Sequence, residues 1–339
     1  MAHLISGNSA NELWLNAKKL IDTEGKDVDV GNRKTKEVLH VYVELSRPTN
    51  KWVYRRIPPL SIGFALAELM WIVNGSQESQ IIDFWNPQLK DYAADEGKDF
   101  YHGAYGYRLK ISHGFEQLER AYQALSCNPN SRQAVLLIWS PKIDFPDNNG
   151  NPRSKDIPCN ICSLLKIREG RLDWTQIMRS NDLVLGLPYN LVQFTGLQEI
   201  LAGWLDIKVG TYNHYSDSLH IYDEYKHFKK VDYLHDAETL TNTDTLSISK
   251  KDFDRVAEEI FKRMKKMSAQ QKPSADELCE LATLGSKFEA YNNILFIIGA
   301  YGAIRQDLKP LAIDLVKKCT NPVYTNMWNQ WIANNPLHK

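Results

Sequence analysis

The sequence predicts an α+β fold, with a mixed body followed by a mainly helical C-terminal region. Short strand patterns and longer apolar helices share the chain up to about residue 230, and only helical patterns follow. The chain has 339 residues, of which 43% are hydrophobic and 24% charged, so it can bury a large core. We therefore expect two domains, residues 1–235 and residues 236–339.

The predicted elements of the first domain rest on apolar periodicity. Val38–Leu45 alternates as a strand does, and the turn Glu169-Gly170 joins two strand patterns into a hairpin. Asn74-Gly75 is a good stop for the apolar helix before it. The other expected elements are helices at 10–21, Ile62–Val73 and Tyr189–Leu205 and strands at Ala134–Trp139, Ser163–Ile167 and Arg171–Met178.

The second domain is predicted to be helical throughout. The polar segments Asp236–Asp244 and Ser268–Ser274 are candidate boundaries. The expected helices are Lys250–Met267, Glu277–Leu284, Tyr291–Ala303 and Leu308–Lys318.

Charge and hydropathy exclude several classes of function. Lys+Arg and Asp+Glu both number 41, so no global charge attracts nucleic acid, and the basic run Lys262–Lys266 is best interpreted as a solvated helix face. No stretch approaches the roughly 18 apolar residues of a membrane span, and the N-terminus has no apolar leader. We expect a soluble cytoplasmic protein that does not contact membranes.

The five cysteines are an odd number in a chain without an apparent leader, which favours reduced thiols. Cys159 and Cys162 form a C-x-x-C pair, but a zinc site needs about four ligands and no second pair or nearby His joins them. We therefore expect no metal.

Three motifs carry residues suited to chemistry. Cys159 lies in the segment IPCN, where an inert core thiol is the ordinary alternative. In MRSNDLVLGLPYN, Arg179 and Ser180 suit a phosphate, while Asn190 offers a donor and an acceptor side by side. A charged strand end followed by a Gly-Pro turn would explain the same residues structurally. In LHIYDEY, His220 and Tyr222 would share one face of a strand.

Taken together and in this order, the motifs resemble the thymidylate synthase family. That family has a Pro-Cys nucleophile, an Arg-Ser-x-Asp-x-x-Leu-Gly-Leu-Pro-(Phe/Tyr)-Asn block and a His-(Leu/Ile)-Tyr block. The resemblance covers residues 30–230 approximately. It implies a thymidylate-synthase-like large twisted mixed β-sheet with flanking helices, plus a C-terminal helical extension, and a homodimer formed through the sheet.

The resemblance also implies roles for individual residues. Cys159 would attack C6 of a pyrimidine nucleotide monophosphate, activated by the positive charge of Arg179. Asn190 would orient the ring, and Glu68 would organise water for proton transfer. The remaining implied contacts are Tyr105 in the active-site wall, Arg33, Ser180 and the other subunit's Arg132 at the phosphate, His220 and Tyr222 at the sugar, and Trp85, Asp182 and Gly186 at the co-substrate 5,10-methylenetetrahydrofolate.

Four departures from the family pattern concern the end of the reaction. Asn160 replaces the usual His, Met178 the usual Gln, and Gln133 the second cross-subunit Arg, and the usual C-terminal closing segment is absent. A site open to water suits a nucleotide hydroxymethylase, in which water rather than hydride reaches the new carbon. Asn190 favours uracil, because cytidylate-specific members carry Asp there. Thymidylate-type methylation of dUMP, hydroxymethylation of dUMP or dCMP, and a non-catalytic nucleotide sensor or assembly protein all remain open.

Overall fold

The computed structural model describes residues 2–30, 33–95, 97–225 and 242–334. These residues form two compact units. The sheet unit contains residues 2–60, 117–139 and 159–225, and the helical unit contains residues 61–116, 140–158 and the described residues from 242 onward. The predicted domain boundary between residues 235 and 236 lies outside the described residues and stays a prediction.

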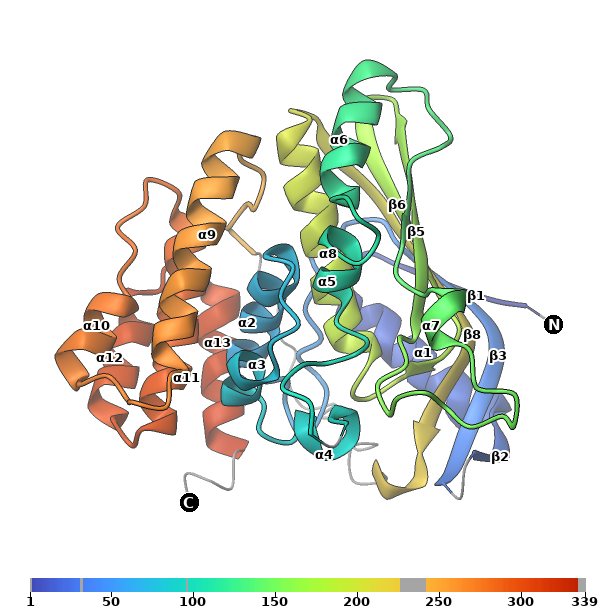
Figure 1. Cartoon of the computed structure of the whole chain (residues 1–339), viewed down its shortest axis with the longest axis horizontal. Helices are drawn as coiled ribbons and strands as arrows, with labels where there is room; N and C mark the ends of the chain where they lie inside the picture. The colour runs from blue at the N-terminus through green and yellow to red at the C-terminus, as the bar shows by residue number, and fades with distance from the viewer. Residues whose placement is uncertain (1, 31–32, 96, 226–241, 335–339) are drawn as a thin grey trace. The chain divides into compact units, whose positions relative to one another are not determined.

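The sheet unit is built on one mixed sheet of eight strands (Figure 1). Its main path runs β1-β3-β8-β6-β5-β4, while β2 pairs with β3 and β7 with β8. The β1–β3, β6–β8 and β7–β8 pairs are parallel, and the others are antiparallel. The strands are β1 (His3–Gly7), β2 (Lys26–Val30), β3 (Arg33–Leu45), β4 (Val135–Leu137), β5 (Asn160–Arg168), β6 (Arg171–Met178), β7 (Asn181–Asp182) and β8 (Lys208–Tyr222). The predicted mixed sheet with flanking helices is confirmed.

The predicted hairpin joins β5 to β6. Glu169 and Gly170 both have positive φ, 51° and 66°, as a two-residue turn of the primed type requires. At its other end the β5–β6 register shifts between Asn160 and Cys162. Such a bulge changes the face on which the following side chains lie, and Asn160, Ser163 and Leu165 are consequently all buried.

Three helices belong to the sheet unit: α1 (Ala10–Glu24), α6 (Gln117–Cys127) and α8 (Leu187–Trp204). Both α1 and α8 pack against strands of the sheet and against each other. Nearly all residues of α8 are buried, and its Gln198 Nε2 donates to the carbonyls of Leu172 and Thr211 in the sheet. The single charge predicted within this helix, Glu199, is therefore also buried.

The helical unit contains all the other helices of the described chain. Ser61 caps α2 through its hydroxyl, and the helix ends at Asn74 before Gly75, as predicted. These helices are α2 (Ile62–Val73), α3 (Ser79–Trp85), α4 (Leu89–Ala93), α5 (Tyr105–Lys110), α7 (Pro141–Asp144), α9 (Lys250–Met267), α10 (Ala275–Leu281), α11 (Glu289–Arg305), α12 (Lys309–Lys318) and α13 (Pro322–Asn334).

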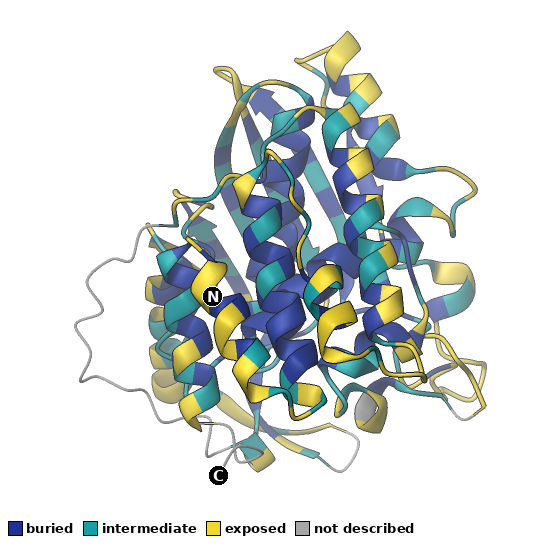
Figure 2. Cartoon of the chain, turned by 90° about the vertical axis from the view of Figure 1, so that its left-hand side faces the viewer, coloured by how far each residue is buried: buried dark blue, intermediate teal, exposed yellow. Residues whose placement is uncertain are grey.

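Helix α2 forms the centre of the helical unit. It contacts α3 and α5 from the same part of the sequence and α9, α11 and α13 from the C-terminal region. Glycines allow two of these contacts, since a Cβ at Gly63 would lie 2.8 Å from Tyr301 and one at Gly106 would lie 2.3 Å from the Ile72 carbonyl oxygen. Outer helices carry exposed residues along one side and buried residues along the other, as Figure 2 shows.

Candidate active site

The hairpin brings Cys159 and Arg179 together at one end of the sheet. Cys159 directly precedes β5 and Arg179 directly follows β6, and the Arg179 backbone N–H donates to the Cys159 carbonyl at 3.0 Å. The Arg179 Nη2 lies 3.9 Å from the Cys159 Sγ. The thiol is half-buried and the guanidinium exposed, so a cation adjoins an accessible sulfur atom.

The side chain of Asn190, from the first turns of α8, is held in one orientation. Its Nδ2 lies 3.4 Å from Met178 Sδ and 3.2 Å from Asn181 Oδ1. A thioether sulfur can only accept, so this end of the Asn190 amide must be the donor. Both amide hydrogens thus point into the protein, and Oδ1 is the atom that Asn190 can offer to a ligand.

A buried hydrogen-bond chain continues from Asn190 into the sheet. The Asn181 Nδ2 donates to His214 Nε2 at 2.9 Å and to Ser216 Oγ at 3.1 Å, and His214 Nδ1 lies 2.9 Å from the Tyr212 hydroxyl. Burial lowers the pKa of His214 to about 3, so the ring is neutral. Because Nε2 accepts, the proton is on Nδ1 and donates to Tyr212, an assignment that follows from the network.

Asp182 lies between the nucleophile segment and α8, and it shapes the turn there. Its Oδ1 accepts the backbone N–H groups of Val184 and Leu185, each at 2.6 Å. Its Oδ2 is buried and has no hydrogen-bond partner among the described residues. Asp182 pairs in register with His220. Burial raises the pKa of the Asp182 carboxyl and lowers the pKa of the His220 imidazole.

His220 and Tyr222 lie close together near the end of β8, as their two-residue spacing predicts. Their rings pack edge to face, with centroids 4.9 Å apart. The Arg33 guanidinium lies 3.6 Å from the Tyr222 ring centroid and pairs with Glu224. Burial raises the pKa of the Tyr222 hydroxyl, the charge of Arg33 opposes this shift, and Asp182 and Cys159 add to it. Tyr222 therefore lies among the predicted nucleophile, phosphate and folate residues of the sheet unit.

The other predicted residues of the sheet unit occupy less enclosed positions. Ser180 is half-buried between β6 and β7, and Gly186 is the N-cap residue of α8. Arg132 is exposed just before β4. Burial lowers the pKa of Lys166, with smaller contributions from the positive charges of Arg168 and Arg132.

Three predicted residues belong to the helical unit. Glu68 is half-buried on α2, where ten of the twelve residues are fully buried. Tyr105 begins α5 and is also half-buried. Trp85 is only 1% exposed, and its indole N–H donates to the Ile298 carbonyl at 3.2 Å. The predicted contact of Trp85 with folate stays a prediction, since this contact is with α11.

Sequence reasoning missed Arg56 and Gln176. Arg56 is buried and donates to the carbonyls of Val184, Pro58 and Pro59, which fixes the turn that contains Asp182. Gln176 is buried in β6 and contacts Asn160. A polar residue at a position that alternation assigns to the core was the available signal for Gln176.

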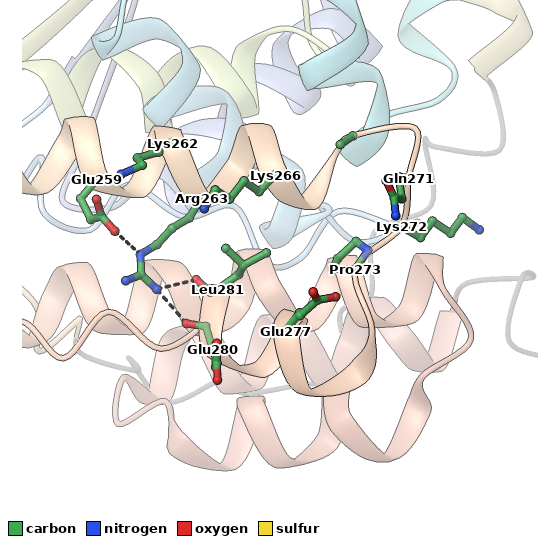
Figure 3. A pocket seen from close by; sticks show the side chains of 11 residues that line it. Glu259, Lys262, Arg263, Lys266, Gln271, Lys272, Pro273, Glu277, Glu280 and Leu281 are labelled. Carbon is green, nitrogen blue, oxygen red and sulfur yellow. Dashed lines mark hydrogen bonds and ion pairs between the residues drawn. The ribbon is translucent and has the colours of Figure 1, made fainter.

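A hollow of about 650 Å³ in the helical unit is lined by α9, α10 and the loop between them (Figure 3). Arg263 has a structural role there. It forms an ion pair with Glu259 and donates hydrogen bonds to three carbonyls at the end of α10, those of Glu280, Leu281 and Thr283. Lys262 and Lys266 are exposed, as expected of a solvated helix face. None of the predicted chemical residues lines this hollow.

Neither a metal-binding cluster nor a membrane-spanning helix occurs among the described residues. No group of three or more His, Cys, Asp or Glu side chains is arranged to hold a metal ion. No described helix combines the length and apolar character that crossing a membrane requires.

The mixed sheet brings Arg179 beside Cys159, and Asn190 contacts both Met178 and Asn181. The thymidylate synthase family model matches residues 31–271, and the chain belongs to this family.

Individual relatives cover different shares of the chain. A deoxyuridylate hydroxymethyltransferase of Bacillus phage SP01 is 31% identical over 66% of this chain and 60% of its own length. One of Pseudomonas phage M6 is 33% identical over 61% of this chain and 57% of its own length. A putative thymidylate synthase of Methanothermobacter marburgensis is 29% identical over 68% of this chain and 98% of its own length. The chain thus spans about 60% of the two phage relatives.

Proposed function

We propose that this chain transfers a one-carbon unit to C5 of a pyrimidine nucleotide monophosphate, with dUMP the favoured substrate, through a covalent adduct on Cys159. The observation that carries the proposal is the 3.9 Å approach of the Arg179 guanidinium to the Cys159 sulfur. A neighbouring cation favours the thiolate, which is the nucleophilic form of the side chain.

The protein residues supply the steps around the ring. Cys159 Sγ forms a bond to C6, and the C5–C6 π electrons move to O4, so that C5 becomes a nucleophile. Asn190 orients the ring, and Glu68 directs proton movement at O4 and C5 through water. After C5 has gained the new carbon and lost its proton, the Cys159–C6 bond breaks. Arg33, Arg179, Ser180 and the partner's Arg132 bind the phosphate, and His220 and Tyr222 bind the sugar.

The co-substrate we propose is 5,10-methylenetetrahydrofolate. Asp182 fits it, because its Oδ2 is a buried acceptor without a partner among the described residues and suits the N–H donors of a pterin ring. Gly186 and Trp85 are the other proposed contacts, and Tyr105 contributes to the wall of the site. When bound, the folate supplies the one-carbon unit that C5 takes up.

We further propose that the enzyme acts as a homodimer through its sheet. Leu39, Val135 and Leu137 are apolar strand residues that are 47%, 42% and 46% exposed. Val135 and Leu137 are two residues apart on β4, and neighbouring exposed apolar side chains are typical of surfaces that a partner covers. Arg132 lies three residues before the start of β4, so the same association would carry it toward the partner's nucleotide.

We favour hydroxymethylation as the final step of the reaction. Asn160 and Met178 depart from the thymidylate pattern, and the two phage relatives are named deoxyuridylate hydroxymethyltransferases. The alternative ending, reduction to a methyl group, would convert the folate to dihydrofolate. The two endings therefore give products of different mass and different folate spectra.

The test is tritium release from C5-labelled dUMP and dCMP, with and without methylenetetrahydrofolate, followed by mass analysis of the nucleotide. We expect folate-dependent release from dUMP and a hydroxymethyl product. Cys159→Ala should abolish release and the covalent mass shift with 5-fluoro-dUMP, whereas Cys162→Ala should retain both. Tight reversible binding of 5-fluoro-dUMP without an adduct would instead identify a nucleotide sensor, and no release from either nucleotide would refute the enzyme.

A further inference from the structure

Asn160, the residue directly after the nucleophile, carries a buried donor that nothing in the described structure satisfies. Its side chain is 0% exposed, and Nδ2 has no hydrogen-bond partner among the described residues. An unsatisfied buried amide is costly, and native proteins normally retain one only where a ligand or an ordered water completes it. The position next to Cys159 therefore points to an acceptor that arrives with the substrate.

The orientation of the Asn160 amide follows from Gln176. The Trp174 indole N–H donates to Gln176 Oε1 at 3.2 Å, and an indole can only donate. The Gln176 Nε2 lies 3.1 Å from the Cys162 carbonyl, which can only accept. Gln176 therefore has one possible orientation, and its Nε2 donates to Asn160 Oδ1 at 2.7 Å. The NH₂ group of Asn160, and not its oxygen, is consequently the end of the amide without a partner among the described residues.

Asn160 and Asn190 are linked through Met178. Asn160 is the cross-strand partner of Met178, and the Met178 sulfur accepts from Asn190 Nδ2. Since both amide hydrogens of Asn190 are used internally, Asn190 can offer only Oδ1 to a base. Asn160 offers only hydrogens. The two side chains thus divide between them the acceptor and the donor that one amide usually provides.

We propose that Asn160 Nδ2 donates to O4 of the pyrimidine base while Asn190 Oδ1 accepts from N3–H, so that Asn160 selects uracil over cytosine. The inference rests on the proposed function. Uracil presents an acceptor at C4 and a donor at N3, which match this pair. Cytosine presents an amino group at C4, whose hydrogens would oppose the hydrogens of Asn160.

The test compares Asn160→Ala with the unmodified enzyme on dUMP and on 4-thio-dUMP, whose C4 sulfur is a weaker acceptor. We expect kcat/KM for dUMP to fall roughly 10- to 100-fold, the loss for 4-thio-dUMP to be much smaller, and discrimination against dCMP to weaken. Equal losses for dUMP and 4-thio-dUMP would overturn the proposal, because the amide would then bind a water or only support the fold.

Asn160→Asp is the second variant, and it carries the test if Asn160→Ala fails to fold. It keeps the shape and the acceptor for Gln176 but replaces the donor by an oxygen, so preference should shift from dUMP toward dCMP. An unchanged preference would contradict the proposal. Ser163→Ala is the matched control, since Ser163 Oγ also donates to Gln176 Oε1, at 2.6 Å, while Trp174 and Cys162 still fix the Gln176 amide. Its preference should not change.

Calorimetric binding of dUMP and dCMP separates this inference from the proposed function. If the unmodified enzyme neither binds nor turns over either nucleotide, the proposed function fails. If it turns over dUMP and the Asn160 variants lose activity on dUMP and 4-thio-dUMP alike, only the inference about Asn160 fails.

Discussion

Lys51 and Glu199 form an ion pair inside the sheet unit, with Lys51 Nζ 2.7 Å from Glu199 Oε2 and side chains only 4% and 3% exposed. Glu199 lies on α8, the helix that also carries Asn190. The pair therefore ties the loop that follows β3 to the helix that orients the proposed base-binding side chain.

Removal of one member of this pair should be strongly destabilising. Lys51→Met leaves a buried carboxylate without its cation, and we expect the free energy of unfolding to fall by about 3–5 kcal/mol. The double variant Lys51→Met/Glu199→Leu should recover most of that loss, because no buried charge remains. Urea denaturation of the three proteins measures both effects. A single variant as stable as the unmodified protein would show that water reaches the pair.

The buried His214 should make the sheet unit sensitive to acid. Its folded-state pKa of about 3 lies below the ordinary 6.5, so between these values the unfolded chain binds more protons. The contribution of neutral, buried His214 to the free energy of unfolding is therefore fully present above pH 6.5 and is lost as the pH falls toward 3. Between about pH 7.5 and about pH 5 the loss from this group should be about 2 kcal/mol.

His214→Gln tests this expectation, since glutamine does not titrate and can still accept from Asn181. Denaturant unfolding at the two pH values should show a smaller pH-dependent loss in the variant. The same loss in both proteins would assign the acid sensitivity to other groups.

Asn181 should support base recognition without contact to the base. Asn181→Ala removes the acceptor that orients Asn190, so we expect KM for dUMP to rise roughly 10-fold with a smaller change in kcat. Ser216→Ala is the control, because it removes another partner of Asn181 but leaves the bond to Asn190. If the two variants behave alike in steady-state kinetics, the Asn190 orientation does not depend on Asn181.

Two glycines of the helical unit should respond oppositely to alanine. A Cβ at Gly106 would lie 2.3 Å from the Ile72 carbonyl oxygen, so Gly106→Ala should cost about 1–3 kcal/mol through overpacking. A Cβ at Gly302, within α11, would meet its nearest atom at 3.6 Å. Gly302→Ala should therefore be neutral or stabilise by up to about 1 kcal/mol. Thermal melting ranks the variants, and an unaffected Gly106→Ala would mean that α5 can move away from α2.

The spacing of apolar residues predicted those helices and strands that bury one face or all of their residues. Helices Ile62–Val73 and Lys250–Met267 have the predicted bounds, because each begins at a serine cap and carries a clear apolar pattern. The strand β2 was not predicted, since its sequence KDVDV is largely exposed and pairs only with β3. Helix α13 was also not predicted, although its buried Val323, Tyr324, Met327, Trp328 and Trp331 follow a helical spacing.

The family resemblance, rather than the residue types alone, predicted which residues of the site are neighbours. Cys159 and Arg179 were predicted as neighbours, and the hairpin brings them within 3.9 Å. The residues that hold the site residues in place were not predictable. Asn181, His214 and Gln176 form hydrogen bonds with residues that are distant in the sequence or on another strand. The Gln176–Asn160 contact joins β6 to β5 and the Asn181–His214 contact joins β7 to β8, so only the pairing of strands in the folded sheet brings these residues together.

The helices that pack together in the helical unit are synthesised at different times. Ten of the twelve residues of α2 are buried, and its partners α9, α11 and α13 come much later in the chain. At roughly 5–20 residues per second, the ribosome needs on the order of ten seconds or more to reach them. During that interval α2 has no C-terminal partner, so the nascent chain should be a client of chaperones that bind apolar helices.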